Sequence, residues 1–148
     1  MGSLVLPTSG LVYLDTPIFV YTVEHHSTYS PLLAPLWQSV AAGDLEIAAS
    51  ELCLMETLIR PIRDGDHPLA ARYEQMLGQP NLRFLPINQA ILREAANLRA
   101  TVKALRTPDA LHAATALSAG AAMFLTNDRD FRAVPNLPVT ILKDVLAT

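Results

Sequence analysis

Four acidic residues occupy positions where a fold could bring carboxylates together: Asp15, Glu56, Asp109 and Asp128. Asp15 ends the short apolar run 11–15, and Asp128 comes just after the apolar run 122–126. In open parallel sheets, ligands bind beyond the carboxyl ends of the strands, at the point where the strand order reverses. We therefore expect Asp15 and Asp128 to converge at one edge of a sheet.

Such a cluster implies divalent cations. Two carboxylates about 4 Å apart repel each other by about 4 kcal/mol at an effective dielectric of about 20. Four carboxylates must therefore become protonated, spread apart or bind cations. Oxygen ligands suit Mg²⁺ or Mn²⁺, and two ions about 3.5–4 Å apart are a known arrangement for in-line attack of water at phosphorus.

Each acid also has a simpler interpretation. Asp15 and Asp128 suit turns or helix caps, and Asp109 suits the first turn of a helix. Glu56 lies at the edge of the apolar stripe of its predicted helix, from where its side chain could also extend into water. Taken singly, these positions leave both interpretations open.

The elements that would position the acids alternate between short apolar runs and helical stretches. We predict strands at 11–15, 46–49, 82–86, 122–126 and 139–142, and helices at 16–26, 30–42, 50–60, 68–77, 88–102 and 107–119, with a helical turn at 128–132. This alternation favours parallel βαβ crossovers with helices on both faces of the sheet. The length of 148 residues suits one domain, 1–148.

The charge distribution is uneven, although the net charge is only −3. All 11 Lys and Arg residues lie from Arg60 onward, whereas residues 1–59 carry six acids. This excludes a uniformly basic protein that coats nucleic acid. No apolar run approaches the roughly 18 residues that cross a bilayer, and nothing resembles a secretory signal, so we expect a cytoplasmic protein without a membrane part. The single cysteine, Cys53, makes a disulfide scaffold or a thiolate zinc site improbable.

Four segments resemble the PIN-domain family of metal-dependent ribonucleases, and in particular its VapC-type toxins. They are VYLDTPIFVYTVE at 12–24, SELCLMETLIRP at 50–61, TPDALHAATAL at 107–117 and FLTNDRDF at 124–131, in the family's order and spacing. The resemblance implies a three-layer α/β/α fold with a five-stranded parallel sheet in the order 3-2-1-4-5. It also implies an endoribonuclease that hydrolyses RNA phosphodiester bonds, as the toxin of a type II toxin-antitoxin pair.

Carried over to this chain, the resemblance implies that Asp15, Glu56, Asp109 and Asp128 are catalytic and hold one or two Mg²⁺ or Mn²⁺ ions, with Asp130 as an accessory ligand. Thr16 and Thr126 match polar positions with a role in hydrogen-bonding a carboxylate or a metal-bound water, although a helix cap explains Thr16 equally well. Pro17 departs from the family, which usually has Asn or Ser there, so we leave it out of the site.

Basic residues and histidines have less specific patterns. Arg60, Arg106 and Arg129 are candidates for contacts with RNA phosphates, because guanidinium donors match phosphate oxygens; a favourable position at a helix end explains them equally. His112 follows Asp109 by three residues and shares its helix face, where we expect a buried structural histidine. The pair His25 and His26 is expected to fray the end of the first helix.

The resemblance also implies two protein partners, a small antitoxin whose tail covers the acidic pocket and a second copy of the chain in a homodimer. Apolar residues of the first two helices could form such surfaces or belong to the core; they include Ile18, Val20, Leu33, Leu36 and Trp37. The alternative function is a non-catalytic PIN-like module that binds protein or RNA. The four acids argue against it, because a binding module has no need of a repulsive cluster.

Overall fold

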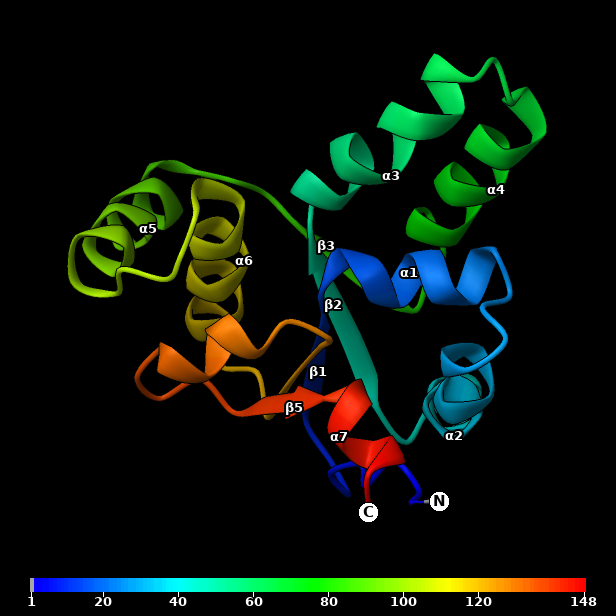
Figure 1. Ribbon diagram of the computed structural model, residues 1–148, viewed down its shortest axis with the longest axis horizontal. Coiled ribbons are helices and arrows are strands. Elements are labelled where there is room, and N and C mark those ends of the chain that lie inside the picture. The colour runs from blue at the N-terminus through cyan, green and yellow to red at the C-terminus, as the bar shows by residue number, and fades with distance from the viewer. Residues whose placement is uncertain (1) are drawn as a thin grey trace.

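A computed structural model describes residues 2–148 and contains a parallel sheet in the order β3-β2-β1-β4-β5 (Figure 1). The strands are β1 (Leu11–Leu14), β2 (Glu46–Ser50), β3 (Leu82–Leu85), β4 (Met123–Thr126) and β5 (Val139–Ile141). The central strand β1 pairs with β2 on one side and β4 on the other. The predicted α/β class, strand number and strand order are confirmed.

The helices cover both faces of this sheet. They are α1 (Thr16–Val23), α2 (Tyr29–Ala41), α3 (Leu52–Arg63), α4 (His67–Leu77), α5 (Gln89–Thr101), α6 (Thr107–Ser118) and α7 (Leu142–Leu146), with a 3₁₀ helix η1 at Arg129–Ala133. Figure 1 shows α5 and α6 on one face, and α1, α2 and α7 on the other. The chain is therefore a three-layer α/β/α sandwich.

Alternation along β1 creates the two cores. Successive side chains of a strand point to opposite faces. Val12 and Leu14 pack with residues of α1, α2 and α7, whereas Leu11 and Tyr13 pack with residues of α5 and α6. Because β1 is buried on both faces, its register places the residue that follows it, Asp15, at a fixed point on the edge of the sheet.

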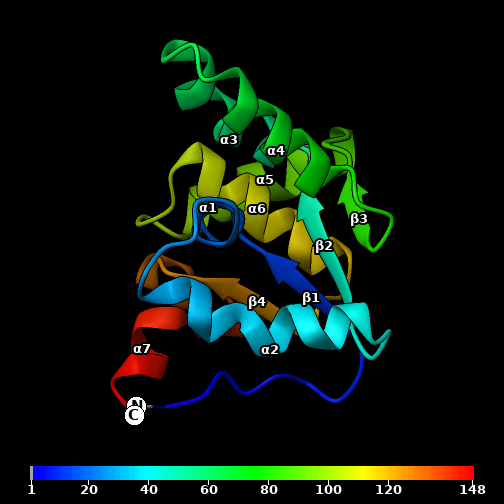
Figure 2. The ribbon, with the colours of Figure 1, turned by 90° about the vertical axis from the view of Figure 1, so that its right-hand side faces the viewer.

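Helices α3 and α4 lie side by side and extend beyond the carboxyl end of the sheet (Figure 2). They are joined to the end of α1 through one carboxylate. Glu24 accepts hydrogen bonds from Arg60 of α3 and from the hydroxyl of Tyr73 of α4. This contact orients α3, the helix that carries Glu56, toward the sheet.

Two predicted helix ends are wrong, and one helix was missed. Helix α1 ends at Val23, and the following turn is ordered, because the Nδ1 atom of His26 accepts from the backbone N–H groups of residues 28 and 29. Helix α3 continues past Pro61 to Arg63, since the side chain of Pro61 is buried and basic residues in the last turn favour the helix C-terminus. The terminal helix α7 was not predicted.

The apolar residues of the first two helices belong to the core. Ile18, Leu33 and Leu36 are fully buried, so these three cannot form a partner surface, whereas Val20 and Trp37 are partly buried and pack against the core. Four of the six exposed large apolar side chains lie on α3, where Met55 and Ile62 are 57% and 68% exposed; the other two are Val5 and, on α5, Leu92. Within residues 2–148, no helix is long and apolar enough to cross a membrane.

Candidate active site

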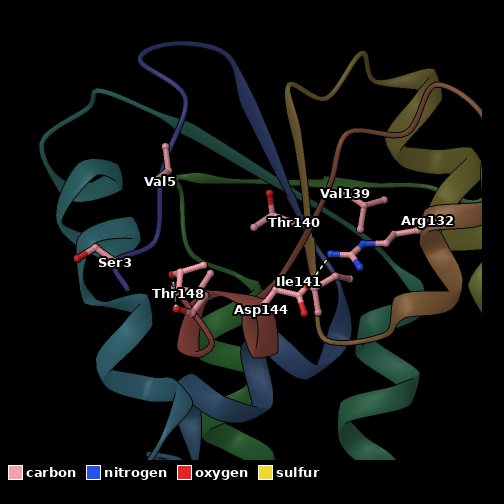
Figure 3. A pocket seen from close by; sticks show the side chains of 9 residues that line it. Ser3, Val5, Arg132, Val139, Thr140, Ile141, Asp144 and Thr148 are labelled. Atoms are coloured by element: carbon pink, nitrogen blue, oxygen red, sulfur yellow. Dashed lines mark hydrogen bonds and ion pairs between the residues drawn. The ribbon is translucent and has the colours of Figure 1, made fainter. Parts of the chain in front are cut away.

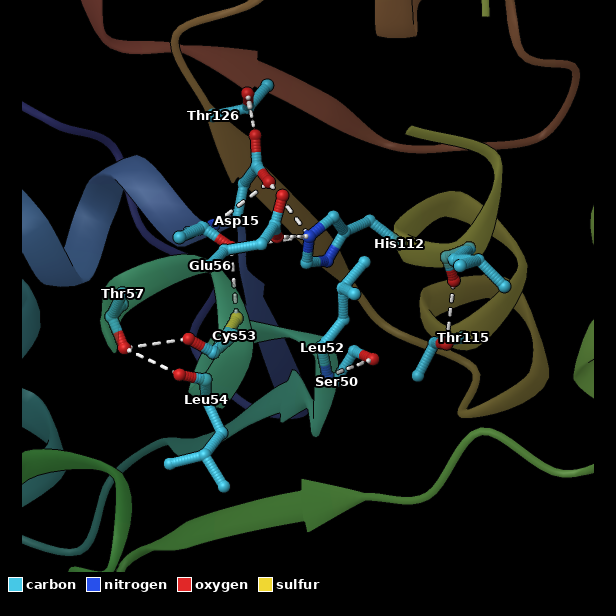
Figure 4. Close-up of polar contacts among 12 residues, drawn as sticks. Asp15, Ser50, Leu52, Cys53, Leu54, Glu56, Thr57, His112, Thr115 and Thr126 are labelled. Atoms are coloured by element: carbon cyan, nitrogen blue, oxygen red, sulfur yellow. Dashed lines mark hydrogen bonds and ion pairs between the residues drawn. The ribbon is translucent and has the colours of Figure 1, made fainter. Parts of the chain in front are cut away.

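Asp15 lies at the carboxyl edge of the sheet, between β1 and β4. Its backbone N–H donates to the carbonyl of Leu125 in β4. Its carboxylate caps α1 by accepting from the N–H of Thr16 at 2.9 Å, and its second oxygen accepts from the hydroxyl of Thr126 at 2.7 Å (Figure 4). Only 6% of Asp15 is exposed. Two strands and one helix therefore hold this carboxylate in place.

Glu56 reaches the same place from α3. The hydroxyl of Thr16 donates to its Oε1 atom at 2.7 Å, while the N–H of Thr16 binds Asp15. One threonine thus joins the two carboxylates. The inward positions of α3 on either side, Cys53 and Thr57, are buried, and the Glu56 side chain is 26% exposed, at the border between core and solvent.

His112 comes from α6, on the opposite side of the sheet edge. As predicted, it is buried, with 2% exposure. Its Nε2 atom lies 2.7 Å from Oε1 of Glu56 and 3.7 Å from Oδ1 of Asp15, while its Nδ1 atom lies 2.7 Å from the hydroxyl of Tyr13. These contacts were not predicted, although the spacing from Asp109 and the alternation along β1 place His112 and Tyr13 on facing surfaces.

The remaining predicted acids stand around this pair. Asp109 lies in the first turn of α6, one turn before His112, and its Oδ2 atom accepts from the N–H of Arg106 at 3.1 Å. Asp128 follows β4; its N–H donates to Thr126, and its Oδ1 atom accepts from the N–H of Asp130. Asp130 itself is exposed. The structure joins the carboxylates of Asp15 and Glu56 through Thr16, and it links the backbone of Asp128 to Asp15 through Thr126. Among the described residues, no shared contact joins the carboxylates of Asp109 and Asp128 to this pair.

The donor set fits a hard divalent cation by its chemistry. Within residues 2–148, no three or more His, Cys, Asp or Glu side chains already stand in a metal-binding arrangement. Three of the four acids nevertheless keep one carboxylate oxygen without a hydrogen bond to a described residue: Oε2 of Glu56, Oδ1 of Asp109 and Oδ2 of Asp128. Carboxylate oxygens are the ligands that Mg²⁺ and Mn²⁺ prefer.

The local environment shifts the pKa values of Asp15 and Glu56 in opposite directions. Burial raises the pKa of Asp15, and this exceeds the opposite effects of His112 and Thr126. Burial also acts to raise the pKa of Glu56, but the hydrogen bond with His112 outweighs it, and the pKa is lowered. For His112, burial favours the neutral ring, yet Glu56 and Asp15 raise its pKa overall. Asp15 is thus the carboxylate that gains most from a nearby cation.

The arginines predicted to contact phosphate are exposed at the surface and paired with acids. Arg60 pairs with Glu24, Arg106 lies 3.7 Å from Asp109, and Arg129 lies 2.9 Å from Asp144, which Arg132 also contacts. Exposed pairs of this kind are weak, so a phosphate could replace the carboxylate. Contact of these arginines with RNA stays a prediction.

Two further concave regions contain none of the four acids. One is a 320 Å³ cavity between the N-terminal segment, β5 and α7, lined by residues such as Val5, Thr140 and Thr148 (Figure 3). The other is a 560 Å³ apolar groove along α3, lined by Leu54, Met55, Leu58, Ile59 and Ile62. The first is also lined by Arg132 and Asp144 and the second by Glu51 and Arg63, but each contains a single carboxylate and so lacks the group of acids that binds a divalent cation.

Comparisons with known proteins identify the family of the chain and agree with its fold. The PIN-domain family model matches residues 12–137. A search of curated proteins finds no match. Among solved structures, VapBC2 from Rickettsia felis bound to a promoter DNA fragment aligns with a TM-score of 0.70 and 22% identity over 88% of this chain and 98% of that chain. A toxin-antitoxin complex from Klebsiella pneumoniae aligns with a TM-score of 0.67 and 22% identity over 88% and 97%.

A third structure, VapC20 of Mycobacterium tuberculosis, described as a toxin that cleaves the sarcin-ricin loop, aligns with a TM-score of 0.69 and 18% identity over 82% of this chain and 93% of that chain. At these identities the structural neighbours establish the fold alone. The family model covers most of the chain, including all four predicted acids. The chain belongs to the PIN-domain family.

Proposed function

We propose that this protein is a metal-dependent endoribonuclease whose catalytic acids are Asp15, Glu56, Asp109 and Asp128, with Asp130 as an accessory. The observation that carries the proposal is the pairing of Asp15 and Glu56 through Thr16 at the carboxyl edge of the sheet. Among residues 2–148, no Lys or Arg pairs with this buried and this half-buried carboxylate, and His112 is the basic side chain beside them. This is an environment that a divalent cation stabilises.

The residues of the chain have separable roles in this proposal. Asp15, Glu56, Asp109 and Asp128 would hold one or two Mg²⁺ or Mn²⁺ ions, which supply a Lewis acid for phosphoryl chemistry and lower the pKa of water. Thr126 and Thr16 orient the carboxylates of Asp15 and Glu56 by donating hydrogen bonds. The exposed guanidinium groups of Arg60, Arg106 and Arg129 would attract the RNA backbone.

Cleavage of RNA by the purified, antitoxin-free chain tests the proposal. With Mn²⁺ or Mg²⁺, the wild-type chain should cleave structured RNA, and EDTA should abolish cleavage. Asp109→Asn should lower the rate by roughly two orders of magnitude or more, because it removes one ligand of a group worth several kcal/mol. Asp64→Asn is the matched control, since Asp64 is an exposed acid at the end of α3.

The choice of RNA matters for the negative result. One solved relative is described as cleaving a single structured loop. The panel should therefore contain ribosomal and transfer RNA as well as generic transcripts. Equal cleavage by wild type and Asp109→Asn would reject the catalytic assignment, and Mn²⁺-independent RNA binding without cleavage would favour the non-catalytic module.

We also propose an antitoxin protein as partner, which makes the chain the toxin of a type II pair. Structural neighbours were crystallised as toxin-antitoxin complexes. The apolar groove along α3 is the surface we assign to this partner, because Met55 and Ile62 expose large apolar side chains beside Glu56 on the same helix. Co-expression with the product of an adjoining short reading frame, compared between wild type and Ile62→Lys, measures this interaction.

A second copy of the chain is the other proposed partner. Light scattering on the free chain measures the mass in solution. A mass of twice 16.1 kDa supports a homodimer, and 16.1 kDa rejects it.

A further inference from the structure

A chain of hydrogen bonds behind Glu56 is not explained by cation binding alone. The backbone N–H of Ser50, at the end of β2, donates to the hydroxyl of Tyr13 at 3.1 Å. This hydroxyl lies 2.7 Å from Nδ1 of His112, whose Nε2 lies 2.7 Å from Oε1 of Glu56. Tyr13 is fully buried, and its ring stacks on Phe124 at 5.1 Å and 5°. This series of hydrogen bonds therefore starts from residues that core packing holds in place, Ser50 and Tyr13.

The directions of these hydrogen bonds follow from counting protons. The Tyr13 oxygen accepts from Ser50, and its own proton also needs an acceptor because the group is buried. Within residues 2–148, Nδ1 of His112 is the acceptor in reach. Nδ1 then carries no proton, and the proton of the neutral imidazole is on Nε2. A proton on Nδ1 instead would leave the phenolic hydrogen without a partner.

This tautomer directs an N–H group at one oxygen of Glu56. The Nε2–H of His112 and the hydroxyl of Thr16 both donate to Oε1, each at 2.7 Å. No described residue donates to Oε2. Two donors that come from different elements, α6 and α1, fix the plane and rotation of the carboxylate and leave its other oxygen free.

We propose that His112, with its tautomer set by Tyr13, is a positioning residue that holds Oε1 of Glu56 so that Oε2 is presented to the divalent cation. The inference rests on the proposed function, because it assigns a purpose to a contact beside the proposed ligands. In this role His112 differs from a purely structural core histidine, whose hydrogen bonds would do no more than satisfy its own ring nitrogens. Here the ring connects the buried end of β2, through Tyr13, to Glu56 at the edge of the site, so that packing in the core fixes the position of the Glu56 carboxylate.

The tautomer is measured first, in the metal-free chain at alkaline pH, by long-range ¹H–¹⁵N correlation of the labelled imidazole rings. We expect His112 to carry its proton on Nε2 in the wild type. In Tyr13→Phe the preference should be lost, because Nδ1 no longer receives a hydrogen bond. A proton on Nδ1 in the wild type would overturn the assignment, whatever the enzymatic activity of the chain.

Affinity for Mn²⁺, measured by calorimetric titration, tests the positioning role. Partners of metal ligands typically change metal affinity by about 10–100-fold when they are removed. We expect Tyr13→Phe to weaken binding by roughly tenfold and His112→Ala by more. His112→Gln should recover part of the loss, since its amide keeps a donor near the position of Nε2. Tyr29→Phe is the matched control, because that tyrosine lies at the start of α2, where its ring packs on His26 outside the site.

The outcomes separate the two proposals. Wild-type affinity in both Tyr13→Phe and His112→Ala would overturn the positioning role and leave the nuclease proposal intact. A wild-type chain that binds no Mn²⁺ would overturn the proposed function, and the tautomer measurement would still decide the hydrogen-bond assignment. If Tyr13→Phe unfolds, as circular dichroism would reveal, the comparison of His112→Gln with His112→Ala decides the positioning role.

Discussion

Asp15→Asn should stabilise the metal-free protein while it abolishes the metal response. Asp15 is a carboxylate with 6% exposure, whose pKa is raised by burial. Its ionised form is therefore held in an environment that disfavours charge. Replacing it with a neutral side chain of the same shape removes this penalty, provided that its hydrogen bonds survive.

The two hydrogen bonds are compatible with asparagine. Asn caps a helix as well as Asp does, so the contact with the N–H of Thr16 is kept. The hydroxyl of Thr126 already accepts from the N–H of Asp128 and can rotate to accept from an amide as well. This rotation takes away the acceptor of its own buried hydrogen, which offsets part of the gain. We expect a gain of about 0.5–2 kcal/mol in the free energy of unfolding. For a chain of this size the melting temperature rises by about 2–4 °C per kcal/mol.

The gain should depend on pH in a defined direction. Because the folded pKa of Asp15 lies above its ordinary value of 3.8, the folded state binds this proton more tightly than the unfolded state. As the pH rises from below 3.8 through the raised folded pKa, the contribution of this group to wild-type stability falls. The difference in the free energy of unfolding between the variant and the wild type should therefore grow over that pH range and stay constant above it.

Urea unfolding with EDTA and with Mn²⁺ tests the whole argument. Mn²⁺ at 100 times its dissociation constant should stabilise the wild type by about 2.7 kcal/mol and Asp15→Asn far less, so that the order of stability reverses. Asp44→Asn, at an exposed acid in the turn before β2, controls for charge and should change neither measurement. An Asp15→Asn chain less stable than wild type in EDTA at neutral pH would refute the reasoning.

Three further perturbations follow from the structure. Burial raises the pKa of Cys53 to about 12, so the native thiol should resist iodoacetamide at neutral pH and react fully in urea, as mass spectrometry would report. Phe124 is fully buried between Tyr13 and Phe131, so Phe124→Ala should lower the free energy of unfolding by about 3–5 kcal/mol in urea titration. Asp144→Ala releases Arg129 and Arg132 at the surface, and filter binding should show tighter RNA binding with a steeper salt dependence.

The fold was predictable because hydrophobic pattern and punctuation agree along most of the chain. The alternation of strands and helices indicated parallel crossovers, and the strand order came from the family resemblance. Boundaries were less predictable where tertiary contacts override local signals. Helix α1 stops early because His25 takes a left-handed conformation with φ 52°, and the N–H of His26 then bonds to the carbonyl of Tyr21. Helix α3 passes through Pro61 because that side chain is buried.

The site was predictable in its residue types and less so in its contacts. The ends of β1 and β4 had to be neighbours in this sheet, which places Asp15 beside Thr126. The link between Glu56 and His112 depends on how α3 and α6 approach each other across the sheet edge. The hydrophobic pattern within a helix does not predict how far it lies from another helix. The spacing of Asp109 and His112 therefore indicated that the two share a helix face, but it did not indicate that Glu56 contacts His112.

The position of β1 explains why one strand supplies both the acid and the support behind it. Tyr13 points to the face covered by α6, and Asp15, two residues later, follows the strand at its carboxyl edge. The hydroxyl of Tyr13 binds Nδ1 of His112, and Oδ1 of Asp15 lies 3.7 Å from Nε2 of the same imidazole. A shift of β1 by one residue would move Tyr13 to the other face and separate all three groups. The register of β1 is set by apolar cores on both of its faces, so the geometry of the acidic pair depends on packing that contains no charged residue.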